Sequence, residues 1–318
     1  MQKPIPSGYS ARTTVDEIVK DLDLTGKIIM ITGGSAGLGL ESTKALAAAG
    51  AKVIVPARNV NKASQALAGI SNVELYPDEM DLSKRETIDA FGRWFQARYD
   101  KLDIMINSAG VMAIPLSRDD QGNEMQISAN YLGHYHLINS LLPQLKKANG
   151  ARVVTLSSRA HWYSAFHFED PNFLHSAYDK WIAYGQAKTA VSLLSVAVNE
   201  LFRKDNIYAF TVHPGSIVTG LSHALSEEEL SAFGAIKSNG ERGYEQYDDE
   251  RKTISEGAAT IVWCAVSPQL NEYGGVYCEN CDIAPLHTDN SMTVGVKAWA
   301  IDKATALKLW EETPRLFK

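Results

Sequence analysis

The sequence predicts an α/β protein of the doubly wound type, with helices on both faces of a seven-stranded, mainly parallel sheet. Short apolar or β-branched runs alternate along the chain with longer segments that have the apolar spacing of helices. Such runs are typical of strands that are buried on both faces of a parallel sheet. No repeat with a period of 20 to 50 residues is visible, which excludes solenoids and propellers. The expected strands are 27–32, 52–57, 73–76, 102–106, 152–157, 207–213 and 276–278.

The composition is that of an ordinary globular protein. Of the 318 residues, 45% are hydrophobic and 21% are charged, so the chain can bury a sizeable core and is not expected to be disordered. The 31 Lys and Arg residues are outnumbered by 37 Asp and Glu residues, which gives a net charge of −6. Because no basic run stands out, nucleic acid is not an expected partner.

Four segments are expected to decorate one α/β domain that spans residues 1–318. They are an N-terminal helical extension (1–25), an aromatic insertion (160–180), a flap (221–252) and a C-terminal helix (302–313). Residues 221–252 are acidic and contain glycine, which makes the segment too polar for a core and too long for an ordinary connection. We therefore expect this segment to be mobile.

Targeting and metal signals are weak. Residues 1–9 lack the basic and apolar pattern of a secretion signal, three cysteines cannot form a disulfide framework, and no apolar stretch is long enough to anchor the chain in a membrane. A cytoplasmic protein is expected. Cys278 and Cys281 follow a late strand without a second ligand pair, and His134 and His136 face apart on a helix, so no metal is expected and the histidines are assigned to packing.

A glycine-rich turn follows the first strand. Gly33, Gly37 and Gly39 allow the backbone to turn tightly and to approach a pyrophosphate closely, and the helical run behind them offers unpaired amide groups. A glycine spacing of this kind also arises by chance. The strand before it, the helix after it and the Asn107–Gly110 turn after the fourth strand favour a Rossmann-type dinucleotide site.

The end of the second strand bears on the choice of dinucleotide. An acidic residue at this position usually binds the ribose 2′-hydroxyl, but here Ala57 is followed by Arg58 and Asn59. A guanidinium binds phosphate well, which favours NADP over NAD. The alternative is that Arg58 only begins a solvated helix, since Lys62 shows that this turn is basic in any case.

One tyrosine has a lysine four residues later. Tyr184 and Lys188 lie in a run with helical apolar spacing, so one helical turn separates them by about 6 Å on one face. An ammonium at that distance is expected to lower the pKa of the phenol, which could then transfer a proton near neutral pH. For the pair alone, a chance arrangement on a surface helix remains the alternative.

Together these motifs resemble the single-domain short-chain dehydrogenases/reductases over about residues 26–285. Within that family, the sequence around Asn130 and the long spacing between Ser158 and Tyr184 are most similar to the retinol dehydrogenase and WW-domain oxidoreductase branch, without its usual membrane anchor. The resemblance implies that Tyr184 is the general acid or base and that Lys188 lowers its pKa and binds the nicotinamide ribose. It also implies that Ser158, rather than Ser157, polarises the substrate carbonyl, and that Asn130 interrupts its helix to hold a proton-relaying water.

The resemblance also implies a set of residues that bind NADP(H). Thr219 is expected to hold the carboxamide. The full set is Gly33, Ser35, Ala36, Gly37, Leu38, Gly39, Arg58, Asn59, Asp81, Leu82, Asn107, Ala109, Gly110, Tyr184, Lys188, Pro214, Gly215, Ile217 and Thr219. Frequent dimers and tetramers in the family imply a homo-oligomer. Ser108 departs from the family's usual asparagine, and the 26 positions between Ser158 and Tyr184 leave the shape of the substrate side open.

An oxidoreductase that reduces a bulky, mostly apolar ketone or aldehyde is the leading hypothesis. Seven aromatic residues fall within or next to the insertion and could favour such a lipophilic substrate, although some of them must simply pack it. They are Trp162, Tyr163, Phe166, Phe168, Phe173, Tyr178 and Trp181. Two alternatives stay open: reduction of a C=C bond, as in relatives of protochlorophyllide reductase, and a signalling or scaffold protein that only retains the fold.

Overall fold

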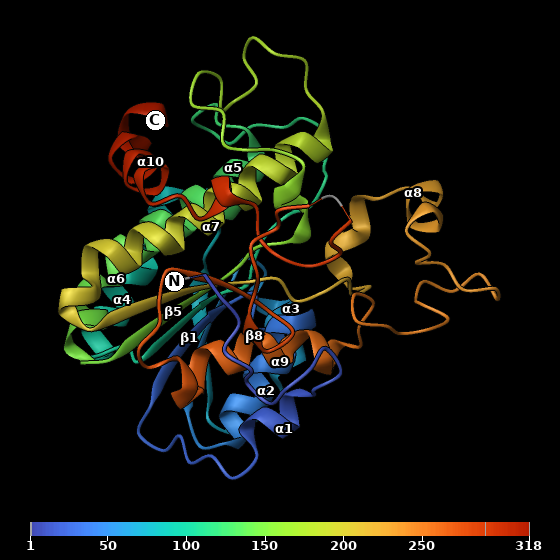
Figure 1. Cartoon of the computed structure of the whole chain (residues 1–318). Helices are drawn as coiled ribbons and strands as arrows, with labels where there is room; N and C mark the ends of the chain where they lie inside the picture. The colour runs from blue at the N-terminus through green and yellow to red at the C-terminus, as the bar shows by residue number, and fades with distance from the viewer. Residues whose placement is uncertain (1, 290, 318) are drawn as a thin grey trace.

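The computed structural model describes residues 2–289 and 291–317 (Figure 1). All of its strands belong to one sheet, in the order β3-β2-β1-β4-β5-β6-β7-β8, and every pair except β7 and β8 is parallel. The predicted doubly wound α/β class is confirmed. The strands are β1 (Ile28–Thr32), β2 (Lys52–Ala57), β3 (Val73–Glu79), β4 (Ile104–Asn107), β5 (Ala151–Leu156), β6 (Ile207–Val212), β7 (Val276–Glu279) and β8 (Asp282–Ile283).

The predicted count of seven strands was one too low. β8 has two residues and pairs antiparallel with β7, so it forms the far edge of the sheet. Asn280 and Cys281 connect the two strands and have φ angles of 54° and 56°. Two consecutive residues with positive φ are typical of a type I′ hairpin turn. A strand of two residues is too short to produce an alternating sequence pattern, which is why the sequence did not indicate it.

Helices cover both faces of the sheet, as Figure 1 shows. One layer contains α4 (Arg85–Arg98), α6 (Gly133–Lys147), α7 (Lys180–Phe202) and α10 (Lys303–Leu316), and the other contains α1 (Val15–Val19), α2 (Gly37–Ala48), α3 (Val60–Leu67) and α9 (Ile254–Val266). Successive residues of β1 face opposite layers: Met30 packs in the first, and Ile29 and Ile31 pack in the second. The strand is therefore apolar on both faces.

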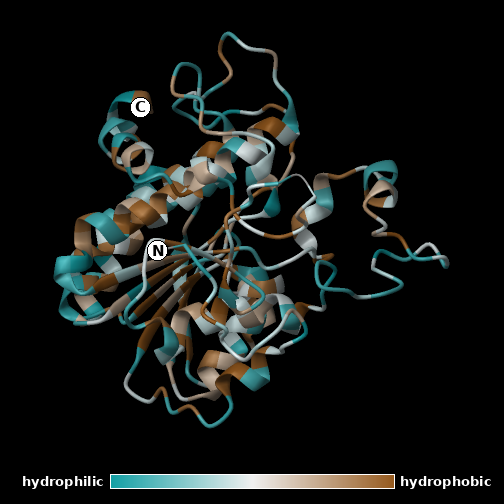
Figure 2. Cartoon of the chain, in the orientation of Figure 1, coloured by the Kyte–Doolittle hydropathy of each residue, from teal (hydrophilic) through white to brown (hydrophobic). Residues whose placement is uncertain are grey.

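Residues 221–252 project from one side of the sheet and include α8 (Glu227–Ala232). We call this segment the flap. Its outer loop is largely hydrophilic in Figure 2. The expectation that it is too polar for a core was wrong in part, since Leu225, Leu230 and Tyr244 are buried in a small apolar cluster of their own. The mobility of the flap stays a prediction.

The strand order positions the functional site. After β1 the chain builds the sheet outward through β2 and β3, then crosses back to β4 on the other side of β1. Ligands of such sheets bind at the carboxyl ends of the strands where the order reverses.

Among the described residues, no helix is long and apolar enough to cross a bilayer.

Candidate active site

The glycine turn after β1 packs backbone against backbone. Gly33 has φ of +68°, and a Cβ at this position would lie 3.1 Å from the Cα and N atoms of Ala109. A Cβ on Gly39 would lie 2.3 Å from the carbonyl oxygen of Gly33. Gly39 has no room for a side chain, and at Gly33 the positive φ and the close approach of Ala109 both disfavour one, so the turn favours glycine at both positions.

The turn leaves the start of α2 open to a ligand. Ala36 is the N-cap residue and has no side-chain oxygen to accept hydrogen bonds from the amides of the first turn, which begins at Gly37. Ser35 and Leu38 flank these two residues in the same turn. Unpaired amides at a helix N-terminus bind phosphate groups, and the glycines allow a close approach. This cradle fits the pyrophosphate of a dinucleotide.

A buried hydrogen-bond chain fixes the turn relative to the neighbouring strand. The Thr32 hydroxyl accepts hydrogen bonds from the amides of Ser108 (3.0 Å) and Ala109 (3.1 Å), so its own proton is directed to Nε2 of His134 at 3.0 Å. Nδ1 of His134 then donates to the carbonyl of Asn130 at 2.8 Å. Burial lowers the pKa of His134 to about 4, so the ring is neutral. The assignment of His134 to packing therefore missed a polar role, which its place four residues after Asn130 could have indicated.

Asn130 interrupts its helix, as expected. It lies in a π-helical turn, Ser128–Leu132, between α5 (Met125–Ile127) and α6. Its side-chain amide accepts from the Val111 amide (2.8 Å) and donates to the Val111 carbonyl (3.0 Å). A Cβ on Gly110 would lie 2.6 Å from Asn130 Oδ1. Asn130 thus holds the loop after β4 in place.

Asn107 ends β4 beside this loop. Its Nδ2 donates to Thr155 Oγ1 at 3.3 Å. Its Oδ1 is buried and has no hydrogen-bond partner within the described part of the chain. An unpaired acceptor of this kind is uncommon in a folded protein and fits a site that awaits a ligand.

Arg58 is exposed and follows β2 directly, at the position where the sequence predicts a residue that binds the 2′-phosphate of NADP. Within residues 2–289 and 291–317, its side chain makes no ion pair or hydrogen bond to the protein. Asn59 has a structural task, because its Oδ1 caps α3 by accepting from the Lys62 amide at 2.9 Å. Arg58 therefore remains available for a 2′-phosphate, whereas the carbonyl oxygen of Asn59 is already used.

Asp81 and Leu82 follow β3. Asp81 accepts hydrogen bonds from the amide (2.9 Å) and hydroxyl (2.8 Å) of Ser83, which orders the turn. Leu82 packs so closely on the start of α6 that a Cβ on Gly133 would lie 2.4 Å from its carbonyl oxygen. Both residues are thus fixed in the turn that follows β3.

The loop after β6 lies against the start of α2. Thr219 faces the start of α2, since a Cβ on Gly37 would lie 3.5 Å from its Cβ. Ile217 packs near Leu38 in the same region, against Gly257. Gly215, which follows Pro214, has φ of +94° and lies against the aliphatic chain of Lys252. The structure thus brings the predicted nicotinamide loop to the glycine turn.

Three of the four predicted catalytic side chains, those of Ser158, Tyr184 and Lys188, lie together at the end of β5. Ser158 is the N-cap of the 3₁₀ turn η2 (Arg159–Trp162), and its hydroxyl lies close enough to the buried Tyr184 phenol to influence the pKa of the phenol. Nζ of Lys188 lies 5.6 Å from the centre of the Tyr184 ring and donates to the Leu156 carbonyl at 2.7 Å. Helix α7 supplies the tyrosine and the lysine on one face, and β5 leads to the serine.

Burial raises the pKa of Tyr184 well above the usual value, and the nearby Ser158 hydroxyl only partly offsets this effect. The Lys188 ammonium donates to the Leu156 carbonyl and not to the phenol. The predicted lowering of the Tyr184 pKa by Lys188 stays a prediction. Burial also lowers the pKa of Lys188 to about 8. At neutral pH the phenol is therefore protonated and can donate a proton.

Ser157 faces away from this group. Its hydroxyl donates to the carbonyl of Lys188 at 2.8 Å and accepts from the Ser192 hydroxyl at 3.0 Å. Both contacts are buried in the packing of α7 against β5. Of the two serines, Ser158 is the one that lies beside Tyr184.

An apolar hollow of about 350 Å³ opens near Tyr184. It is lined by Tyr163, Trp181, Ile182 and Phe233, the last from the flap. The Trp181 ring lies 6.4 Å from that of Tyr184 and 5.3 Å from that of Phe233. Of the seven predicted aromatics only Tyr163 and Trp181 line the hollow. Phe166 and Phe173 are buried, and the others pack elsewhere.

Comparison with known proteins places this geometry in context. The sequence profile of the short chain dehydrogenase family matches residues 27–230. A Streptomyces lividans protein named "Probable oxidoreductase" is 39% identical, with 91% of this chain and 97% of that protein covered. A short-chain dehydrogenase/reductase of Penicillium roqueforti is 33% identical, with 95% and 89% covered. The NADP complex of Pseudomonas aeruginosa RhlG has a similar fold, with a TM-score of 0.61, 23% identity, and 80% and 94% covered.

Proposed function

The chain belongs to the short-chain dehydrogenase/reductase family, and we propose that this oxidoreductase uses NADP(H) to reduce a bulky, mostly apolar ketone or aldehyde to an alcohol. The observation that carries the proposal is the meeting of Ser158, Tyr184 and Lys188 beside an apolar hollow. The enzymatic reduction of a carbonyl group requires a hydrogen-bond donor, a proton donor and a hydride donor. The chain itself supplies the hydrogen-bond donor and the proton donor.

Each residue has a defined task in this reaction. NADPH, when bound, supplies the hydride. The Ser158 hydroxyl binds and polarises the carbonyl oxygen, and Tyr184, which burial keeps protonated, donates its proton to that oxygen. The Lys188 ammonium lies 5.6 Å from the ring and favours the negative charge that develops on the phenol oxygen as the proton leaves. Lys188 and Thr219 would hold the cofactor on either side.

Two further features support the details. Arg58 is exposed and unpaired within the described residues at the position where a 2′-phosphate would lie, which supports NADP over NAD. Cys264, Cys278 and Cys281 are buried free thiols, which supports a location in a reducing compartment such as the cytoplasm.

A substrate panel tests the proposal. The value of kcat/KM would be measured with NADPH and with NADH for acetone, a sugar aldehyde, an aryl ketone and a polycyclic ketone. We expect the bulky apolar compounds to exceed acetone by about a hundredfold, which corresponds to about 2.7 kcal/mol or about 110 Å² of additional buried apolar surface. The hollow of about 350 Å³ is open and apolar, so it offers an aromatic surface against which a ring or a chain could pack.

Two results would contradict the proposal. A flat profile, or a preference for the sugar, would show that the aromatic side chains serve only the structure. An enone included in the panel decides between the two reductions, because a saturated ketone as product would identify a C=C reductase and an unsaturated alcohol would identify a carbonyl reductase.

A further inference from the structure

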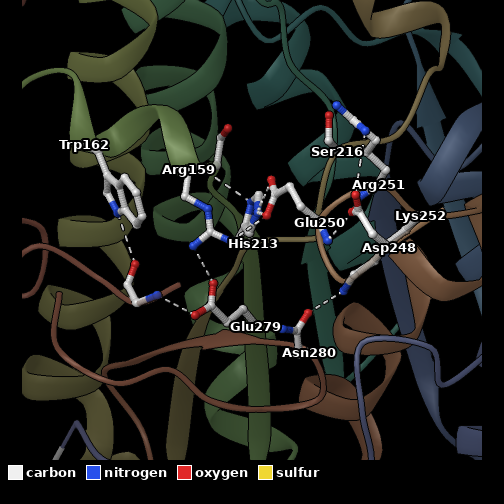
Figure 3. A network of polar contacts seen from close by, with 12 residues as sticks. Arg159, Trp162, His213, Ser216, Asp248, Glu250, Arg251, Lys252, Glu279 and Asn280 are labelled. Atoms are coloured by element: carbon white, nitrogen blue, oxygen red, sulfur yellow. Dashed lines mark hydrogen bonds and ion pairs between the residues drawn. The ribbon is translucent and has the colours of Figure 1, made fainter. Parts of the chain in front are cut away.

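Arg159, the residue directly after Ser158, bridges two carboxylates from distant parts of the chain (Figure 3). Its Nη1 lies 2.8 Å from Oε2 of Glu279, at the end of β7, and its Nη2 lies 2.6 Å from Oε2 of Glu250, near the end of the flap. The Arg159 side chain is 18% exposed and that of Glu279 only 4%. Two nitrogens of one planar guanidinium fix both partners in direction as well as in distance.

Glu250 connects the arginine to the loop after β6. Its carboxylate accepts a hydrogen bond from Nε2 of His213 at 3.1 Å, while Nδ1 of the same ring accepts from the Arg159 amide at 3.2 Å. The Glu250 carbonyl accepts from the Ser216 amide at 2.6 Å, and Ser216 in turn accepts from the Lys252 amide at 3.0 Å. The side chain of Glu250 therefore joins the end of the flap to the turn that begins at Ser158, and the backbone of Glu250 joins it to the loop after β6.

Glu279 provides the fixed side of the bridge. Its second oxygen accepts from the Gly295 amide at 2.6 Å, and the Gly295 carbonyl accepts from Nε1 of Trp162 at 3.1 Å. The centre of the Trp162 ring also lies 4.9 Å from Cζ of the Arg159 guanidinium, so the guanidinium lies over the ring. One end of Arg159 is thus held by buried structure, and its other end reaches the flap.

The charges favour an intact bridge. Burial by itself would raise the pKa of Glu250, but His213 and Arg159 outweigh that effect and hold the pKa well below its usual range. Glu250 is therefore ionised at neutral pH. Loss of Arg159 would leave Glu279 charged, buried and without its cation, which costs more than the pair itself contributes.

We propose that Arg159 is a positioning residue that ties the flap to Ser158. Because of this tie, the flap closes over a substrate only when the Ser158 hydroxyl is presented to the carbonyl group. The proposal rests on the proposed function. Ser158 and Arg159 share one backbone turn, so a movement of Glu250 with the flap shifts the serine. Small misplacements of a group that binds the reacting atom cost large factors in rate.

Glu250→Gln tests this tether without disturbing the core, since the Glu250 side chain is 42% exposed. We expect kcat for the preferred carbonyl to fall about tenfold, with the NADPH dissociation constant and the melting temperature nearly unchanged. Trypsin cleavage after Arg251, whose backbone pairs with Ser216, should become at least about fivefold faster because the flap end opens more often. The matched control is Glu241→Gln, which removes the same charge from the same flap at an exposed pair with Lys237 and should behave as the wild type.

A second background measures the coupling directly. In an Arg159→Met protein, Glu250→Gln should change kcat less than about twofold, because its partner is already gone. The proposal is overturned if Glu250→Gln leaves both kcat and cleavage unchanged, or if its effect on kcat is the same in both backgrounds. If the wild-type protein reduces no carbonyl at all, the proposed function fails, and the cleavage comparison still decides whether the tether exists.

Discussion

Replacement of Tyr184 by phenylalanine should remove catalysis while leaving the fold and the cofactor site almost intact. The phenol is buried and protonated, and in the proposed reaction it donates its proton to the carbonyl oxygen. General acid catalysis of this kind contributes a factor of about 10² to 10⁴, which corresponds to about 2.7 to 5.5 kcal/mol in the activation free energy. The structural loss is at most one hydrogen bond of the phenol, worth about 1 kcal/mol of stability. The catalytic loss therefore exceeds the structural loss by a wide margin.

The assay separates these two quantities. Carbonyl reduction would be followed in single turnovers with NADPH at saturation, the NADPH dissociation constant by fluorescence titration, and the free energy of unfolding by denaturant. Tyr208→Phe is the control, because this tyrosine lies near the start of β6, at the opposite end of the sheet from the site. The reasoning is refuted if Tyr184→Phe keeps more than about a tenth of the wild-type rate, or if NADPH binding is lost together with the rate.

The remaining predictions concern the cofactor, the pH dependence and the core. Wild-type protein should bind NADPH at least about tenfold tighter than NADH, since one phosphate contact supplies about 1.4 kcal/mol of binding free energy. Arg58→Ala should lose this preference. Equal dissociation constants of the wild type for NADPH and NADH would contradict the role of Arg58. Burial lowers the pKa of Lys188 to about 8, so the ammonium is present below that pH and lost above it. The value of kcat/KM for reduction should therefore fall as the pH rises through about 8. Lys188→Arg should move this fall to higher pH in a pH–rate profile. Gly39→Ala should abolish NADPH binding in a titration because its Cβ would lie 2.3 Å from the Gly33 carbonyl oxygen, whereas Gly220→Ala, which points into open space, should not. Phe91→Ala should lower the free energy of unfolding by about 3 to 5 kcal/mol in urea titrations, since the ring is fully buried among other aromatic rings; a loss below about 1 kcal/mol would show that this part of the core is loosely packed.

Much of the fold could be predicted because it depends on local patterns. The runs at β1, β2 and β6 are continuous and apolar, and the structure places strands there within about one residue of the prediction. The family assignment from the glycine turn and the Tyr184–Lys188 spacing is confirmed by the match to the short chain dehydrogenase profile. These signals are strong because each is set by the geometry of one turn or one helix.

The sequence by itself therefore determined the α/β class, the family and the set of residues that could do the chemistry. Only the tertiary structure decided how these residues are used: that the Ser157 hydroxyl bonds to the backbone of α7, that two of seven aromatics line the hollow, and that Arg159 meets Glu250 and Glu279. The physical reason is the separation along the chain. Arg159 and Glu250 are 91 positions apart, so their contact follows from how helices and loops pack on the sheet, and no local periodicity records it. The pKa of Tyr184 is likewise set by burial, which depends on every element packed around the site.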